Sequence, residues 1–122
     1  MCVKVKKQIW LNFNIYNQEH SKHFDERAER ILAAINCENT QGLGKITKCF
    51  LCNTGHSGGD ELHVITKNAI IIIINAKTHR LITLLIARPQ QIERYYNACG
   101  IKVPEKIINK AKRHNQMHLN DI

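Results

Sequence analysis

Proline and long apolar runs are both scarce in this 122-residue chain. It contains only two prolines, and the five isoleucines of residues 70–74 fall far short of the roughly 20 residues that span a bilayer. No apolar segment of signal-peptide length follows the basic first seven residues. With 43% apolar residues, the composition excludes a disordered tail and predicts one folded domain over residues 1–122, with no membrane partner.

The sequence motifs of several enzyme classes are absent as well. The chain has no nucleophile elbow, no Walker loop, no dinucleotide fingerprint and no H-E-x-x-H zinc motif. Its ten acidic residues form no close paired set, which argues against a nuclease that holds two metal ions with carboxylates.

The five cysteines are odd in number and irregular in spacing. This argues against a disulfide framework and favours a soluble protein in a reducing compartment. Cys49 and Cys52 form one C-x-x-C pair, and Cys37 and His56 complete a set of four candidate zinc ligands. A strand places residues three apart on opposite faces, so we expect structural thiols instead, with no metal and no cofactor.

Positive charge dominates what is present. Lys and Arg number 18 against 10 Asp and Glu, a net charge of +8, and seven histidines add charge as the pH falls. A small domain this basic favours a polyanionic partner, most often nucleic acid and less often an anionic membrane or an acidic protein.

Residues 20–36 carry two adjacent faces when they are read as a helix. An apolar stripe suited to packing on a core comprises Phe24, Ala28, Ile31, Leu32 and Ile35. A second row, at i, i+3, i+7 and i+10, flanks that stripe and comprises His20, His23, Arg27 and Arg30. Imidazoles move protons near neutral pH and guanidinium groups fit phosphate oxygens, so the row predicts a phosphodiester site, with a solvated basic flank as the alternative.

The remaining pattern predicts strands followed by helices. Alternating apolar residues predict a strand over 8–16, and residues 45–52 form a second candidate. Three β-branched runs joined by short turns predict a meander over 61–67, 69–75 and 81–87. The isoleucines mark the middle run as a central strand covered on both sides.

Two helices are predicted at the end of the chain, over about 90–99 and about 104–114, before a loose tail at 115–122. We therefore expect an α+β domain with a core over 8–99. Its N-terminal helix packs on a roughly four-stranded antiparallel sheet, and two further helices follow at the C-terminus.

The predicted sheet and the helix after it add candidate phosphate-binding residues. Hydroxyls, an imidazole and ammonium groups lie on the sheet or at its turns: Thr78, Thr83, His63, Lys67 and Lys77. Threonine also simply favours strands, and lysines at turns are usually solvated. Arg88 and Arg94 beside Tyr95 can follow a nucleic-acid backbone and stack bases, unless Tyr95 and Tyr96 pack the helix onto the sheet.

The order of these elements resembles a known family. A helix with H-x-x-x-R-x-x-R, formed by His23, Arg27 and Arg30, precedes a meander that ends in N-x-x-T-x-x-L-I-T between Asn75 and Thr83. Over roughly residues 20–87 the chain is similar to the small metal-independent ribonuclease toxins of the Barnase/EndoU/colicin/RelE superfamily. It departs from them in Leu84-Leu85, where a valine and a tyrosine are usual, and in its two C-terminal helices.

This resemblance implies an RNA substrate, often tRNA, that is cleaved in the bacterial cytoplasm. It also implies a toxin of a toxin–antitoxin pair, or the C-terminal part of a secreted toxin of contact-dependent inhibition. An acidic cognate immunity protein or antitoxin is the implied inhibitor. The residues that match the family's motif positions are His23, Arg27, Arg30, Thr78 and Thr83.

We therefore predict a metal-independent endoribonuclease that works through a 2′,3′-cyclic phosphate. The predicted catalytic residues are His23, Arg27, Arg30, His63, Thr78 and Thr83. The predicted nucleic-acid contacts are His20, Lys67, Lys77, Arg88, Arg94 and Tyr95. A non-catalytic nucleic-acid-binding module, and an adaptor or inhibitor that binds an acidic protein, are the alternatives.

Overall fold

The computed structural model describes residues 4–53 and 59–121, and within them it contains one five-stranded antiparallel sheet. The strands follow one another in space in their order along the chain, so each pairs with its sequence neighbour. They are β1 (Lys4–Ile9), β2 (Ile46–Asn53), β3 (Asp60–Thr66), β4 (Ile70–Asn75) and β5 (Leu81–Ile86). The α+β class and the predicted meander are confirmed, but the sheet has five strands instead of four.

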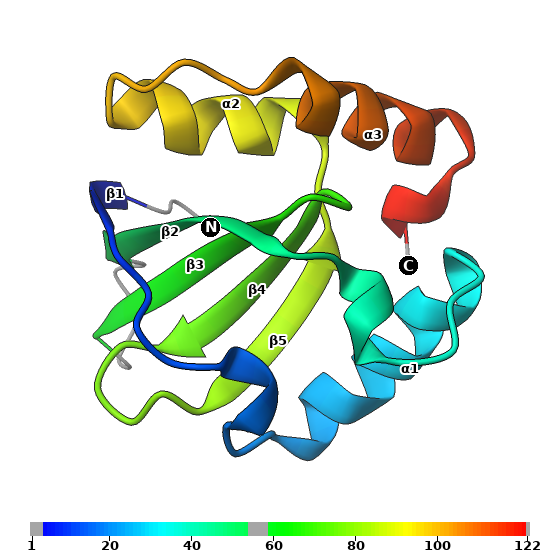
Figure 1. Ribbon diagram of the computed structural model, residues 1–122, viewed down its shortest axis with the longest axis horizontal. Helices are drawn as coiled ribbons and strands as arrows, with labels where there is room; N and C mark the ends of the chain where they lie inside the picture. The colour runs from blue at the N-terminus through cyan, green and yellow to red at the C-terminus, as the bar shows by residue number, and fades with distance from the viewer. Residues whose placement is uncertain (1–3, 54–58, 122) are drawn as a thin grey trace.

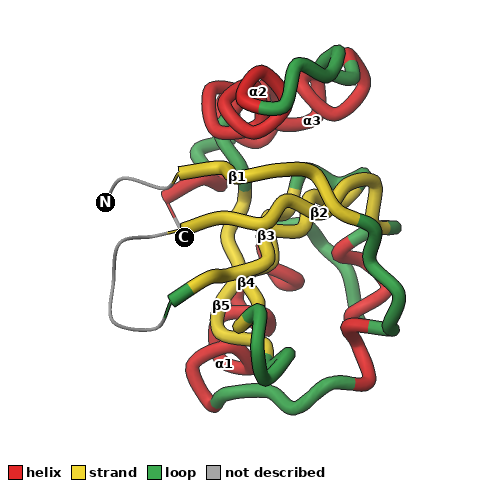
Figure 2. Tube along the Cα trace, turned by 90° about the vertical axis from the view of Figure 1, so that its left-hand side faces the viewer, coloured by secondary structure: helices red, strands yellow, loops and turns green. Residues whose placement is uncertain are grey.

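The described α-helices lie on both sides of this sheet. They are α1 (Lys22–Ala34), α2 (Pro89–Ala98) and α3 (Glu105–Gln116). Figure 1 shows α2 and α3 together on one side, and α1 on the opposite side beside β5. Figure 2 shows the same arrangement after a quarter turn, with the strands between the two groups of helices. None of the helices in the described ranges is long and apolar enough to cross a bilayer.

Each face of the sheet buries its own apolar cluster, because side chains alternate along a strand. The cluster beneath α1 joins that helix to alternate strand residues and includes Phe24, Ile31, Leu62, Val64, Ile72 and Leu84. The cluster beneath α2 and α3 includes Phe50, Cys52, Ile65, Ile71, Ile92 and Tyr96. The isoleucine run of β4 contributes to both clusters, as expected for a central strand.

The N-terminal strand differs from the prediction. β1 covers Lys4–Ile9 instead of 8–16, and it is followed by the 3-10 turn Ile15–Asn17. The chain has to leave the β1 edge because α1 packs beside β5, the opposite edge of the sheet. The alternation after Ile9 reflects packing beneath the sheet, where Leu11, Phe13 and Ile15 join the cluster under α1.

The N-terminal helix and the C-terminal tail also need correction. A strand, β1, precedes α1, so the first element of the chain is not a helix. Residues expected to form a loose tail continue α3 to Gln116 and then form the 3-10 turn Leu119–Asp121. The side-chain amide of Asn120 donates to the carbonyl oxygens of Ile86 and Ala87, at 3.2 and 2.8 Å. These bonds fix residue 120 against the end of β5.

Candidate functional site

The start of α1 is fastened to the free edge of β5. Ser21 caps the helix by accepting the backbone N–H of Phe24, and its own hydroxyl donates to the carbonyl of Ile82 at 3.0 Å. The backbone N–H of Ser21 donates to the carbonyl oxygen of Leu81, and the N–H of Leu81 donates to the carbonyl oxygen of Glu19. The edge groups at the start of β5 are therefore satisfied by Glu19 and Ser21, and the first turn of α1 is held beside the strand.

Two residues of the basic row, His23 and Arg27, contact β5 from α1. His23 lies in the first turn, where its Nε2 is 3.2 Å from the hydroxyl oxygen of Thr83. One turn later, the Nε of Arg27 donates to the carbonyl of Leu84 at 2.5 Å. His23 is exposed and Arg27 is half-buried. The structure thus brings His23 to Thr83 and gives Arg27 a role in holding the helix on the strand.

A second group lies on β3 and α2. His63 is only 1% exposed, with its Nε2 3.1 Å from a Glu61 carboxylate oxygen and its Nδ1 2.6 Å from the Tyr95 hydroxyl. A carboxylate only accepts hydrogen bonds, so in the neutral ring Nε2 donates to Glu61 and Nδ1 accepts from Tyr95. The side chain of Glu61 keeps 20% of its surface exposed. The chain of hydrogen bonds fixes one oxygen of a partly accessible carboxylate.

The sheet register relates these two groups. His63 lies opposite Ile73 on β4, and Ile73 lies opposite Thr83 on β5. Opposite residues of an antiparallel pair point to the same face, so His63, Ile73 and Thr83 form one row, with Glu61 two residues along β3 on that face. Two strand spacings, about 10 Å, separate the His63 and Thr83 backbones. Half-buried Ile73 lies between them, and His23 approaches the row from the β5 edge.

The protonation of His63 makes the stability of the fold depend on pH. Burial lowers the pKa of His63, against the opposing hydrogen bond and charge of Glu61. Because the folded chain then binds this proton less readily than the unfolded chain, the free energy of unfolding falls as the pH drops below about 6.5. We expect a His63→Gln variant, measured by urea denaturation, to lose less stability between pH 7 and pH 5 than the native chain.

The exposed His118 provides the control for this measurement, since a His118→Asn variant removes a histidine that does not contact His63, Glu61 or Tyr95. His114 has to be kept in both variants, because burial, Lys110 and Arg113 also lower its pKa. An unchanged loss of stability in His63→Gln, or the same relief in His118→Asn, contradicts the prediction.

Several other predicted residues lie outside the contact between His23 and Thr83. The Nδ1 of His20 is 3.0 Å from a carboxylate oxygen of Asp25, and Arg30 is exposed further along α1. Thr78 lies in the turn between β4 and β5, where its hydroxyl accepts the N–H of Arg80. Lys77 shares that turn and is exposed.

The predicted nucleic-acid contacts on α2 divide into buried and exposed residues. Tyr95 is 7% exposed, stacks on Phe50 and bonds His63, so it packs the helix onto the sheet and does not offer a face to a base. Arg88 and Arg94 are exposed, and an Nη of Arg88 donates to the side chain of Asn115. Lys67 is exposed at the turn after β3.

The cysteines are arranged as the strand alternation requires. Cys49 belongs to the apolar cluster under α1 and Cys52 to the cluster under α2, so the two thiols lie on opposite faces of the sheet. Burial raises the pKa of each thiol to about 12. His56, the fourth candidate zinc ligand, lies outside the described residues. Within the described ranges, no group of three or more potential ligands is placed to hold a metal ion.

Sequence reasoning missed Glu61. The signal was available, because Glu61 and His63 are separated by one residue on a predicted strand and therefore share a face. The position of Tyr95 above them could not be predicted, since it depends on which face of the sheet α2 covers.

Comparison of the chain with protein-family models, with curated proteins and with solved structures gives no match. The resemblance to the ribonuclease toxins therefore stays a prediction that rests on the residues quoted for it.

Proposed function

We propose that this protein is a metal-independent endoribonuclease that cleaves RNA through a 2′,3′-cyclic phosphate. The observation that carries the proposal is the contact between His23 and Thr83 at the end of the row that begins at His63. It places the exposed imidazole of His23 at the β5 edge of the sheet face on which β3 carries the partly exposed carboxylate of Glu61. An acid and a base placed on either side of a phosphodiester are what this reaction needs.

In the proposed reaction, the carboxylate of Glu61 removes the proton of a ribose 2′-hydroxyl. The 2′-oxygen then attacks the adjacent phosphorus, the bond from phosphorus to the 5′-oxygen breaks, and His23 protonates the leaving 5′-oxygen. Thr83 holds the imidazole of His23, while His63 and Tyr95 are positioning residues that orient Glu61. Each proton transfer contributes about 10²- to 10⁴-fold to the rate.

The net charge of +8 supports an anionic substrate and an acidic inhibitor. Together with the family resemblance, it leads us to propose a toxin that acts on RNA such as tRNA in the bacterial cytoplasm. A cognate immunity protein or antitoxin of opposite charge would cover the basic edge of α1. Delivery as the C-terminal part of a larger secreted toxin is part of the same proposal.

Incubation of the purified protein with total tRNA in the presence of EDTA tests the proposed activity. We expect fragments whose 3′ ends carry a 2′,3′-cyclic phosphate, because no step uses a metal ion. An absence of fragments, or cleavage that EDTA abolishes, contradicts the proposal.

A non-catalytic nucleic-acid-binding module is the second candidate function. It is favoured by a lysine-lined pocket between β2, α2 and α3 that lies apart from His23 and Thr83. Tight binding that weakens steeply with salt and leaves RNA intact would favour this function over cleavage.

A further inference from the structure

A pocket lies where β2 meets the connection between α2 and α3. Its volume is about 640 Å³. Apolar and aromatic groups line it, from Tyr96, Ile101, Pro104 and Ile107. Four lysines line it as well: Lys48, Lys67, Lys102 and Lys106. A pocket of this composition suits a ligand with a flat apolar body and negative charge.

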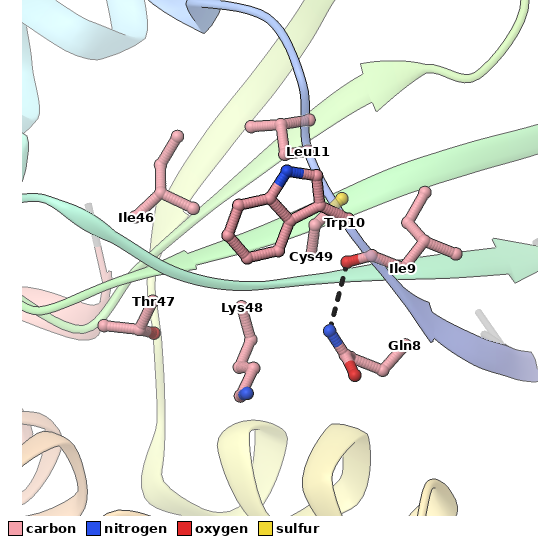
Figure 3. Close-up of a pocket in the computed structure, with 8 residues that line it drawn as sticks. All are labelled: Gln8, Ile9, Trp10, Leu11, Ile46, Thr47, Lys48 and Cys49. Carbon is pink, nitrogen blue, oxygen red and sulfur yellow. Dashed lines mark hydrogen bonds between the residues drawn. The ribbon is translucent and has the colours of Figure 1, made fainter.

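A second pocket of about 240 Å³ adjoins the first, and the two share Thr47 and Lys48. Figure 3 shows the indole ring of Trp10 over β2 in this second pocket, with Lys48 extending away from the ring toward the helices. Trp10 is the only tryptophan of the chain and is 85% exposed. We call the combined lining of these two adjoining pockets the lysine groove, in which Trp10 belongs to the smaller pocket and the four lysines to the larger one.

Tyr96 brings a polar group to the wall of the larger pocket. Its side chain is 1% exposed, and its hydroxyl forms a side-chain hydrogen bond with Thr47, which lines the same pocket. The Thr47 hydroxyl donates to the carbonyl of Ile65, so its oxygen accepts the hydrogen of Tyr96. The oxygen of Tyr96 then keeps a lone pair that can accept a hydrogen bond from an N–H group of a ligand.

We propose that the lysine groove binds a segment of single-stranded nucleic acid. One base enters the larger pocket and bonds the hydroxyl of Tyr96, a neighbouring base stacks on Trp10, and the lysines contact the phosphates between and beside them. Stacking on an aromatic ring and a row of cations are the two elements that single-strand binders combine. This inference extends the proposed function, because it locates where a substrate strand is held. It depends on nucleic acid being the partner of the protein, but not on cleavage of that nucleic acid.

The groove lies at the opposite end of β3 from Glu61. Lys67 follows the last residue of β3, whereas Glu61 is near its first residue. Binding at the groove and chemistry at the candidate site can therefore be tested separately.

The first test measures binding of a fluorescein-labelled single-stranded DNA 12-mer by anisotropy, and of an unlabelled copy by Trp10 fluorescence. DNA lacks the 2′-hydroxyl, so cleavage plays no part. In the Lys102→Glu/Lys106→Glu variant, loss of two phosphate contacts weakens binding roughly 25-fold at 0.1 M salt and flattens the salt slope by about 1.4. The matched control is Lys4→Glu/Lys112→Glu, which lowers the net charge by the same four units, from +8 to +4, at exposed residues outside the groove.

The second test is Tyr96→Phe, which removes the hydroxyl alone. We expect binding of the same 12-mer to weaken about 2- to 10-fold, the effect of one lost hydrogen bond. The variant also loses the hydrogen bond of Tyr96 with Thr47, so urea denaturation of the same preparation measures its stability separately from binding. Loss of stability without loss of binding would overturn the role given to Tyr96.

Further outcomes decide against the groove. Equal weakening in the two double variants would mean that net charge alone drives binding. Binding of phosphatidylserine vesicles that depends on Lys102 and Lys106, with no such dependence for the 12-mer, would mean an anionic membrane instead. Cleavage of tRNA without 12-mer binding at the groove would overturn this inference and leave the ribonuclease proposal intact. Binding at the groove without cleavage of tRNA would support this inference and contradict the ribonuclease proposal.

Discussion

We expect the His23→Ala variant to cleave RNA about 10²- to 10⁴-fold more slowly than the native chain, because the leaving 5′-oxygen loses its proton donor. The imidazole of His23 is exposed in the first turn of α1 and contacts Thr83. Alanine favours the helix and Ser21 still caps it, so the fold should be kept. Initial rates on a tRNA substrate, with circular dichroism and urea denaturation on the same preparation, measure both quantities.

His118→Asn is the matched control for this experiment. His118 is exposed and has a positive φ of 58°, a conformation that asparagine tolerates, so the variant should cleave at the native rate. Native activity in His23→Ala would contradict the proposed role of His23 as the proton donor to the leaving 5′-oxygen. An equal loss in His118→Asn would point to a general effect of histidine charge on RNA binding.

The second large effect is expected for Glu61→Gln. Glutamine is nearly the same size and keeps an oxygen that accepts the hydrogen bond of His63 Nε2, but it cannot remove the 2′-hydroxyl proton. We expect kcat/KM for RNA cleavage to fall by about 10²- to 10⁴-fold. The acid limb of the pH profile of kcat/KM reports the base of the free enzyme, so this limb should disappear.

Glu93→Gln on the exposed surface of α2 makes the same change of charge away from His63. It should leave both the rate and the pH profile unchanged. A native rate in Glu61→Gln, or a lower rate with the acid limb kept, would show that another group removes the proton. Affinity for the single-stranded DNA 12-mer should stay native in Glu61→Gln, because the lysine groove lies at the other end of β3.

The meander and α1 could be predicted because their patterns are local. The isoleucines of β4 leave no polar face, which requires a strand covered on both sides, and the apolar stripe of α1 fixes the side that packs. The strand predicted over 8–16 was wrong for a reason that no local pattern contains. Ile15 is buried and Leu11 and Phe13 are partly buried against the cluster under α1, but the chain crosses beneath the sheet to reach β5 and cannot continue pairing with β2.

In the candidate site, too, local spacing predicts some features and long-range contacts decide the others. Its basic row could be placed on one edge of α1 from spacing alone, and the alternation of β3 could have linked Glu61 to His63. The opposite roles of His23 and His63, one exposed and one buried, depend on which side of the sheet each helix covers. The same placement buries Tyr95, which the sequence presents only as an aromatic residue beside arginine.

The sequence by itself determined the α+β class, the positive charge, the meander and the face of α1 that packs. The charge follows from composition, and the other three follow from the spacing of apolar residues over a few neighbouring positions. Tertiary structure alone decided that His23 meets Thr83, that Tyr95 covers His63, and that four lysines line one pocket with Tyr96. Each of these contacts joins elements far apart in the chain. Their meeting depends on the strand order and on the opposite placement of α1 and α2, which satisfy the burial of two separate apolar faces.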